Sequence, residues 1–302
     1  MKIAIAGGTG FIGSKLTTLL TAKGHSIYIL TRDPSNRPVQ SNVRYVKWLQ
    51  PDDSSIQELE GIDAIINLAG ESIGSGRWTT ERKNRILQSR IQSTQALTDL
   101  IKQLSKKPSV LVNASAIGYY GNSYTETFNE ASAPVEDNFL STVVQAWEKE
   151  AQKASEYGVR VVYCRLGVVL DRQEGALPRM LLPYRLFAGG SLGDGKQWLS
   201  WIHIDDAVRM FEFALENQEI SGPFNVTAPE PYQMSEFGKI ISRVINRPHW
   251  LPTPSFALKV LLGEMSTLVL DGQKVIPEKA KTHGFRYSYP ALEPALTNLL
   301  KT

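Results

Sequence analysis

The sequence predicts an α/β fold in which helices cover both faces of a doubly wound parallel sheet. Apolar runs typical of buried strands alternate with segments whose apolar residues recur at helical spacing over residues 1–230. Residues 1–13 lead from a strand through a glycine-rich turn into a helix. With 302 residues the chain is long enough for one large domain and a smaller appendage.

Each element is expected from its apolar pattern and its turn residues. Strands are expected over 3–6, 26–30, 43–48, 63–70, 109–114, 159–166 and 223–226. Helices are expected over 11–23, 79–106, 139–157, 205–215 and 235–245, and a short helix or turn over 54–60. The last fifty residues predict apolar helices over 256–262 and 268–275, and a terminal helix after Tyr289-Pro290.

Composition excludes several classes of function. Lys and Arg number 33 against 30 Asp and Glu, so no concentrated basic surface for nucleic acid is expected. Cys164 is the single cysteine, which excludes an intrachain disulfide and a cysteine metal cluster; its apolar neighbours predict a buried side chain. No metal site is expected. No run of about eighteen apolar residues and no signal-like start is present, so we expect a cytoplasmic protein without a membrane partner.

The glycines at positions 7, 10 and 13 follow a G-x-x-G-x-x-G spacing, close to the dinucleotide fingerprint. Such glycines allow a tight turn, close approach to a pyrophosphate and close packing of helix on strand. The first turn of the helix then presents free N–H groups to the anion. The predicted contacts are Gly7, Thr9, Gly10, Phe11, Ile12 and Gly13. A tight turn without a ligand is the alternative.

The end of the second strand is where a dinucleotide fold contacts the adenosine ribose. A carboxylate there favours the 2′-hydroxyl of NAD, whereas an arginine accommodates the 2′-phosphate of NADP. Thr31 and Arg32 occupy this place and predict NADP(H). Asp33, one position later, leaves NAD open, and Arg32 as a surface charge is a further alternative.

The strand over 63–70 ends in small residues. Small residues at a carboxyl strand end let the backbone approach a ligand in the crevice of the sheet. Leu68, Ala69 and Gly70 are therefore expected beside the cofactor, and Glu71 is a further candidate. We expect residues 1–230 to form a Rossmann-type NADP-binding domain. The Gly- and Pro-rich loops over 167–201 would form its substrate side, and residues 250–300 a smaller C-terminal lobe on that side.

Several motifs together resemble the extended short-chain dehydrogenase/epimerase superfamily. They are the glycine turn, Asn67-Leu-Ala-Gly70, the loop over 115–121 and Trp201-Ile-His-Ile-Asp-Asp206. Further pieces are similar to an atypical branch labelled "epimerase family protein", formerly cell-division-inhibitor-like, whose members end in a small domain of unknown function. These pieces are Arg77-Trp78, Ser89-Arg90, Trp147-Glu148, Leu262-Gly-Glu-Met265, Gly272-Gln-Lys-Val-Ile-Pro277 and Gly284-Phe285. The resemblance implies an NADP-type cofactor, with Arg90 as a further phosphate or ribose contact.

The chain departs from this superfamily at the catalytic pair. Its enzymes use Tyr-x-x-x-Lys, in which the lysine lowers the tyrosine pKa and binds the nicotinamide ribose. Aligning Glu148 with the glutamate that commonly follows the pair places Leu140 and Val144 at the two positions, and neither side chain titrates. A tyrosine of ordinary pKa is only roughly 0.1% ionised at pH 7, so the loss of the lysine removes base catalysis as well as ribose binding.

Other residues are candidates for the chemistry. Ser115, at the end of a strand, is expected to donate a hydrogen bond to a carbonyl, and Tyr119 or Tyr120 to donate a proton. Aromatic packing in a glycine-flanked turn is the alternative for both tyrosines.

These observations favour an NADP(H)-dependent oxidoreductase that acts on a carbonyl or alcohol of an unidentified small molecule. A sensor or scaffold that holds NADP(H) without turnover, and an epimerase that uses the cofactor transiently, are the alternatives. The helices over 79–106 and 139–157 are candidates for pairing in a homodimer.

Overall fold

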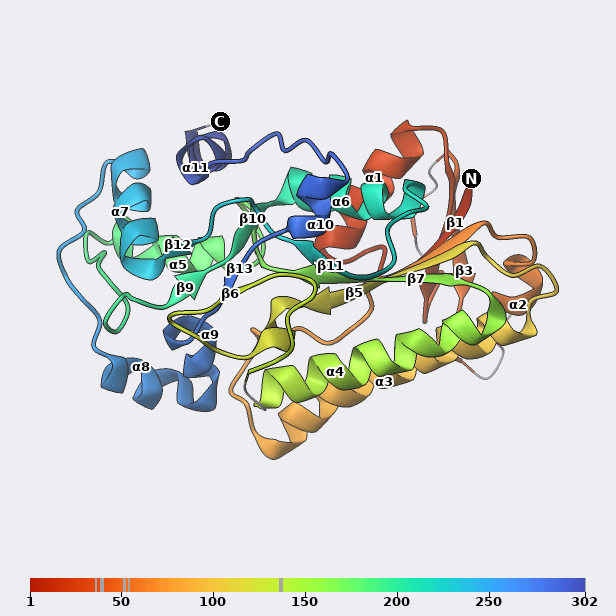
Figure 1. Ribbon diagram of the computed structural model, residues 1–302, viewed down its shortest axis with the longest axis horizontal. Coiled ribbons are helices and arrows are strands. Elements are labelled where there is room, and N and C mark those ends of the chain that lie inside the picture. The colour runs from red at the N-terminus through yellow and green to blue at the C-terminus, as the bar shows by residue number, and fades with distance from the viewer. Residues whose placement is uncertain (36, 39–40, 51–52, 54, 136–137, 302) are drawn as a thin grey trace.

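A computed structural model describes residues 1–35, 37–38, 41–50, 53, 55–135 and 138–301. Its centre is a seven-stranded sheet in which every neighbouring pair is parallel, in the order β11-β7-β5-β4-β1-β2-β3 (Figure 1). The strands are β1 (Lys2–Ala6), β2 (Ser26–Thr31), β3 (Val43–Lys47), β4 (Ala64–Asn67), β5 (Val110–Ala116), β7 (Arg160–Leu166) and β11 (Gly222–Val226). The predicted α/β class and the seven predicted strands are confirmed.

The strand order places a topological switch point between β1 and β4. The chain builds outwards from β1 through β2 to β3, then returns to the other side of β1 and continues from β4 through β5 and β7 to β11. In such sheets the ligand lies in the crevice at the carboxyl ends of the strands flanking the switch. The glycine turn and residues 68–70 follow these two strands directly.

Helices cover both faces of the sheet. Figure 1 shows α3 (Thr80–Gln103) and α4 (Phe139–Gln152) running side by side on one face, and α1 (Phe11–Ala22) and α6 (Ile204–Glu216) on the other. Alternate strand residues supply the two cores, since successive side chains point to opposite faces. Ile3 and Ile5 belong to the core that includes α1 and α6, whereas Ala4 and Ala6 belong to the core that includes α3.

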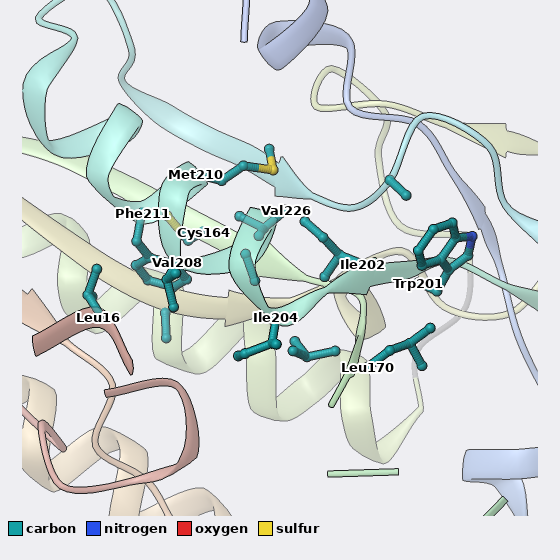
Figure 2. Close-up of a cluster of buried hydrophobic side chains, with 14 of the residues drawn as sticks. Leu16, Cys164, Leu170, Trp201, Ile202, Ile204, Val208, Met210, Phe211 and Val226 are labelled. Atoms are coloured by element: carbon teal, nitrogen blue, oxygen red, sulfur yellow. The ribbon is translucent and has the colours of Figure 1, made fainter. Parts of the chain in front are cut away.

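Cys164 lies in the larger core. Figure 2 shows it among side chains of α1 and α6, including Leu16, Val208, Met210 and Phe211. The thiol is fully buried, and burial raises its pKa well above the ordinary value. The prediction that Cys164 is a small buried apolar residue is confirmed.

The second half of the chain adds short elements around the carboxyl edge of the sheet. Three two-stranded pairs form: β8 (Val168–Leu170) with β10 (Trp201–His203), β9 (Trp198–Leu199) with β12 (Tyr232–Gln233), and β6 (Thr127–Phe128) with β13 (Lys274–Val275). The remaining helices are α2 (Ser55–Glu58), α5 (Leu177–Arg185), α7 (Met234–Ile245), α8 (Ser255–Leu262), α9 (Thr267–Leu270), α10 (Glu278–Thr282) and α11 (Leu292–Lys301). No helix in the described part of the chain is long and apolar enough to span a membrane.

The helix expected over 268–275 is wrong. Helix α9 ends at Leu270, and the chain continues as an extended segment whose residues 274–275 pair with β6. Gly272 explains the change, because a Cβ atom there would come 2.0 Å from the carbonyl oxygen of Trp198. Close approach of two backbones therefore overrides the apolar periodicity of this segment.

The helix expected over 139–157 is shorter in the structure. It ends at Gln152, and the chain continues as a 3₁₀ turn, Lys153–Tyr157.

A substitution of Gly13 tests the packing of α1 against β1. A Cβ atom at position 13 would lie 2.1 Å from the carbonyl oxygen of Gly7, so Gly13→Ala forces the backbone apart. We expect Gly13→Ala to lower the free energy of unfolding by about 3 kcal/mol, measured by urea denaturation. Gly24→Ala is the control: Gly24 has φ +81° but no atom near its Cβ position, so only about 1 kcal/mol is expected. Equal losses would contradict this packing.

Candidate cofactor and active site

The glycine turn after β1 is tight because two backbone segments meet there. Gly7 has φ +77°, and a Cβ atom on it would lie 2.7 Å from the carbonyl group of Leu68, beyond the end of β4. The Gly10 N–H donates to the Gly7 oxygen at 3.0 Å and closes the turn. The N-cap residue of α1 is Gly10, which has no side chain that could accept a hydrogen bond from the first N–H groups of the helix. The first turn of α1 therefore presents main-chain N–H groups at the switch point, an arrangement that fits a pyrophosphate.

The other predicted turn residues differ in exposure. Thr9 is exposed on the turn, whereas Phe11 and Ile12 are half-buried and pack against the larger core. The Phe11 ring lies against Gly175 of the loops over 167–201, where a Cβ atom would come within 3.1 Å of it. Phe11 therefore joins the glycine turn to the predicted substrate side.

The loop after β2 exposes both a carboxylate, Asp33, and an arginine, Arg32. The Asp33 carboxylate accepts hydrogen bonds from the N–H of Ser35 at 2.9 Å and from its hydroxyl, and these bonds lower the pKa of Asp33. The Thr31 hydroxyl donates to the Asp33 carbonyl at 3.1 Å. Arg37 donates to the same carbonyl at 3.3 Å and to the Thr31 hydroxyl at 3.4 Å. Arg32 is exposed beside this turn.

A buried amide network holds the turn after β4. The Asn67 side chain accepts from the Ala69 N–H at 3.1 Å and donates to the Thr94 hydroxyl at 2.9 Å and to the Asn113 carbonyl oxygen at 2.7 Å. The Trp147 indole also donates to Thr94, at 3.0 Å. The network shapes the segment Leu68 to Gly70. Thr94 and Asn113 were not predicted, because polar residues within a helix and a strand give no signal of mutual contact.

Arg90, the predicted further phosphate or ribose contact, lies beside this segment. A Cβ atom on Gly70 would come 3.3 Å from the Arg90 guanidinium carbon. The guanidinium donates to the carbonyl oxygens of Glu71 and Ile86, both at 3.0 Å, and lies 5.0 Å from the Trp147 ring centroid. Burial lowers the pKa of Arg90 to about 10, and the charge of Glu71 opposes the shift. The Glu71 carboxylate itself pairs with Arg82 and Arg85, so its charge is already compensated by α3.

Ser115 belongs to a buried charged cluster. The register aligns Ser115 of β5 with Arg165 of β7. The Ser115 hydroxyl donates to Glu148 Oε1 at 2.6 Å, and Arg165 donates to both Glu148 oxygens through Nε and Nη2, each at 2.8 Å. The sequence predicts that the Ser115 hydroxyl donates to a carbonyl. In the structure it donates to a carboxylate of α4. Ser115 is only 1% exposed.

Arg165 is the functional candidate that sequence analysis missed. Its side chain is 2% exposed, and although burial disfavours the charge, the hydrogen bonds that it donates to Glu148 raise its pKa. Its guanidinium carbon lies 3.4 Å from the Tyr119 ring centroid and 5.0 Å from that of Tyr120. The sequence does carry one indication of this role: Arg165 stands inside the apolar run over 159–166, and a buried charge requires a partner.

The two candidate tyrosines have different environments in the 3₁₀ turn Ile117–Tyr120. Tyr120 is fully buried, its hydroxyl donates to Asn225 Oδ1 at 2.7 Å, and burial raises its pKa to about 12. Its ring stacks on Phe128 at 5.2 Å between centroids. Tyr119 is only partly buried and covers the guanidinium of Arg165. This placement favours Tyr119 over Tyr120 as the residue that meets a substrate.

The two positions aligned with the missing Tyr-x-x-x-Lys pair are apolar and close to this loop. A Cβ atom on Gly118 would come 3.2 Å from Leu140 Cβ, and Val144, one turn later on α4, is buried. The helix therefore approaches the loop closely at these positions without a titratable side chain.

The C-terminal segment supports the same loop. The Gln273 side chain donates to the Ile117 carbonyl at 2.8 Å, and the Ser200 hydroxyl donates to the Gln273 carbonyl at 2.8 Å. The Asn225 amide donates to the Ile276 carbonyl at 3.0 Å. Part of the last fifty residues thus lies behind the Tyr119 turn.

Comparison with known proteins identifies the family. Residues 3–246 match the NAD dependent epimerase/dehydratase family, and residues 253–299 match a domain of unknown function (DUF1731). The chain belongs to the NAD dependent epimerase/dehydratase family. The predicted resemblance to this family and its C-terminal domain is confirmed.

Several relatives align with nearly the whole chain. The chain is 51% identical over 300 residues to the epimerase family protein YfhF of Bacillus subtilis, covering 99% of this chain and 98% of the relative. It is 44% identical over 299 residues to the epimerase family protein SH2119 of Staphylococcus haemolyticus, covering 99% of each.

Two solved structures in the family have similar folds. Human epimerase family protein SDR39U1, solved with NADPH, matches with a TM-score of 0.88 and 34% identity, over 100% of this chain and 99% of that one. A nucleoside-diphosphate sugar epimerase from Corynebacterium glutamicum matches with a TM-score of 0.78 and 30% identity, over 99% of this chain and 58% of that one.

Removal of one partner tests the buried ion pair. Arg165→Met leaves the Glu148 carboxylate buried without its cation, and we expect a loss of about 3–5 kcal/mol in the free energy of unfolding. Urea denaturation followed by circular dichroism measures it. The double variant Arg165→Met/Glu148→Leu removes both charges and is expected to recover most of the loss. A single variant as stable as the parent would contradict the pairing.

Proposed function

We propose that this protein is an NADP(H)-dependent oxidoreductase that acts on a carbonyl or alcohol of a small molecule. The observation that carries the proposal is that two features lie at the same edge of the sheet. One is a glycine turn after β1 that suits a pyrophosphate, and the other is a partly buried tyrosine after β5 whose ring lies against a buried arginine. The bound nicotinamide would supply hydride chemistry, and the protein supplies binding, orientation and a proton.

The loop after β2 supports NADP(H) over NAD(H). One oxygen of the Asp33 carboxylate, Oδ1, is already engaged by the N–H and the hydroxyl of Ser35. Arg32 is exposed at the same point, and Arg37 lies within hydrogen-bond distance of Thr31. Two guanidinium groups around one turn suit a 2′-phosphate. The relative solved with NADPH supports the same choice.

Tyr119 is the proposed proton partner of the substrate oxygen. Its ring is held between solvent and the guanidinium of Arg165, which Glu148 fixes in turn. Arg165 and Glu148 are positioning residues in this proposal, because they act through Tyr119 and Ser115. The guanidinium carbon lies 3.4 Å from the ring centroid, so a cation–π contact holds the ring in place.

Binding without turnover is the second candidate. It is favoured by the apolar Leu140 and Val144 at the positions aligned with the missing Tyr-x-x-x-Lys pair, and by the Ser115 hydroxyl, which donates to Glu148. An epimerase is a third candidate, supported by the sugar epimerase among the structural neighbours.

Arg32→Ala tests the cofactor. Loss of a charge-assisted contact to the 2′-phosphate is expected to weaken NADPH binding about ten- to a hundredfold and to leave NADH binding unchanged. Fluorescence titration measures both affinities. Arg44→Ala is the matched control and is expected to change neither, because it removes an exposed arginine of the neighbouring strand β3 that pairs with Glu58 of α2. Equal weakening of both nucleotides by Arg32→Ala would remove Arg32 from phosphate recognition.

Tyr119→Phe tests the proton partner in a screen of carbonyl substrates with NADPH, followed at the reduced-nicotinamide absorbance band. We expect kcat to fall about a hundredfold with unchanged NADPH affinity. Tyr120→Phe is the control: it leaves the buried Asn225 oxygen without its donor and lowers stability by about 1–3 kcal/mol, with little effect on kcat. Product without net absorbance change would indicate an epimerase. Bound but inert NADPH throughout the screen would favour the second candidate.

A further inference from the structure

One end of the molecule exposes large apolar side chains that no other described element covers. Figure 1 shows α5, α7 and α8 together at this end. Five of these side chains lie at the end of α5 and in the loop after α7. They are Leu182, Leu186, Phe187, Trp250 and Leu251, with exposed fractions of 56, 69, 57, 66 and 46%, and we call them the apolar tip.

Main-chain contacts make the apolar tip one surface. The Trp250 indole donates to the Phe187 carbonyl at 2.9 Å, and the N–H groups of Trp250 and Leu251 donate to the Gly189 carbonyl at 2.9 and 3.0 Å. Leu182 and Leu186 are one helical turn apart, on the same side of the end of α5. The exposed apolar residues of α8 follow shortly in the chain: Phe256, Val260 and Leu261.

Backbone strain contributes to this exposure. Phe187 has φ +60°, a left-handed conformation that bulky residues rarely adopt. Hydrogen bonds hold it there, from its N–H to the Tyr184 carbonyl at 3.0 Å and from the Trp250 indole to its own carbonyl. Strain of this kind persists only where the surroundings impose it, and often at functional sites. Here it holds an aromatic ring out towards solvent.

The two chain segments that carry the apolar tip contain basic residues and no acidic ones. Residues 175–193 and 237–263 contain no Asp or Glu, although the whole chain is nearly balanced at 33 basic and 30 acidic residues. The same two segments contain six basic residues: Arg179, Arg185, Lys239, Arg243, Arg247 and Lys259. The Arg247 guanidinium lies 4.6 Å from the Phe187 ring centroid, and Arg185 lies between Leu182 and Leu186 in the chain. Arg243 pairs with Glu293.

We propose that the apolar tip docks on the surface of an anionic lipid bilayer. Exposed Trp, Phe and Leu side chains partition into the interface between headgroups and acyl chains, and neighbouring arginines add attraction to anionic lipids. A second copy of the chain fits less well, because a symmetric contact through this surface would bring Arg185 and Arg247 close to their own counterparts. The absence of a membrane-spanning run, from which sequence analysis expected no membrane partner, does not bear on surface docking.

The docking surface adjoins the predicted substrate side. Arg179 of α5 donates to the Gly74 carbonyl, and Arg77 donates to the carbonyls of Val260 and Leu261 at 3.1 and 2.9 Å. Gly74 and Arg77 belong to the loop that continues from Gly70 towards α3. Docking would therefore bring the carboxyl edge of the sheet near the bilayer. The proposal goes beyond the proposed function and does not depend on it.

Vesicle co-sedimentation tests the proposal on the full chain. We expect at least tenfold tighter binding to phosphatidylcholine vesicles containing phosphatidylglycerol than to phosphatidylcholine alone, and we expect added salt to weaken this binding.

Phe187→Gly/Trp250→Ser is expected to reduce binding at least tenfold, and glycine accepts φ +60° without strain. Leu49→Gly is the matched control, since Leu49 is 42% exposed, has φ 62° and lies elsewhere. Arg185→Glu/Arg247→Glu is expected to weaken binding by about fivefold or more per residue.

The thermal unfolding midpoint of every variant shows whether it is folded. This check does not use NADPH binding, so the vesicle test is independent of the proposed function. No binding to anionic vesicles would overturn the proposal. Salt-sensitive binding that Phe187→Gly/Trp250→Ser leaves intact would overturn it as well, because the contact would then be electrostatic and located elsewhere. A lipid-free dimer in sedimentation velocity that this double variant dissociates would assign the surface to a second copy instead.

Discussion

The bidentate pair between Arg165 and Glu148 is the interaction on which the candidate active site depends. It joins strand β7 of the main sheet to α4 through two hydrogen bonds of 2.8 Å in a region closed to solvent. Two charges in such a place are tolerated only when each satisfies the other. The pair therefore fixes the position of α4 against the sheet, engages the Ser115 hydroxyl, and provides the cationic surface on which the Tyr119 ring lies.

This arrangement offers a physical account of the missing Tyr-x-x-x-Lys pair. The resemblance places both residues of that pair on the helix, where this chain has Leu140 and Val144. Here the positive charge comes from the neighbouring strand, and the partly exposed tyrosine comes from the turn after β5. The glycine turn follows β1, apart from this change, whereas the Asn67 network reaches Asn113 of β5 and Trp147 of α4.

Periodicity and glycine spacing were enough to predict the sheet, its covering helices and the turn after β1, because these depend on residues close in the chain. The Arg165–Glu148 pair depends on the register of β7 and on the rotation of α4, and neither is encoded locally. The choice between Tyr119 and Tyr120 depends on which of two adjacent rings a 3₁₀ turn directs inwards. The helix expected over 268–275 failed for the same reason, since a tertiary contact at Gly272 decides its conformation.

The central claim is that the chain holds the cofactor with its glycine turn while Ser115, Glu148 and Arg165 remain a closed cluster behind Tyr119. A crystal structure of the NADPH complex tests it most directly. The account predicts the pyrophosphate at the first turn of α1, the 2′-phosphate within hydrogen-bond distance of Arg32, and Ser115 still donating to Glu148 with the Tyr119 hydroxyl facing the nicotinamide. A nucleotide bound away from residues 7–13, or a Ser115 hydroxyl turned from Glu148 to the nicotinamide side, would contradict it.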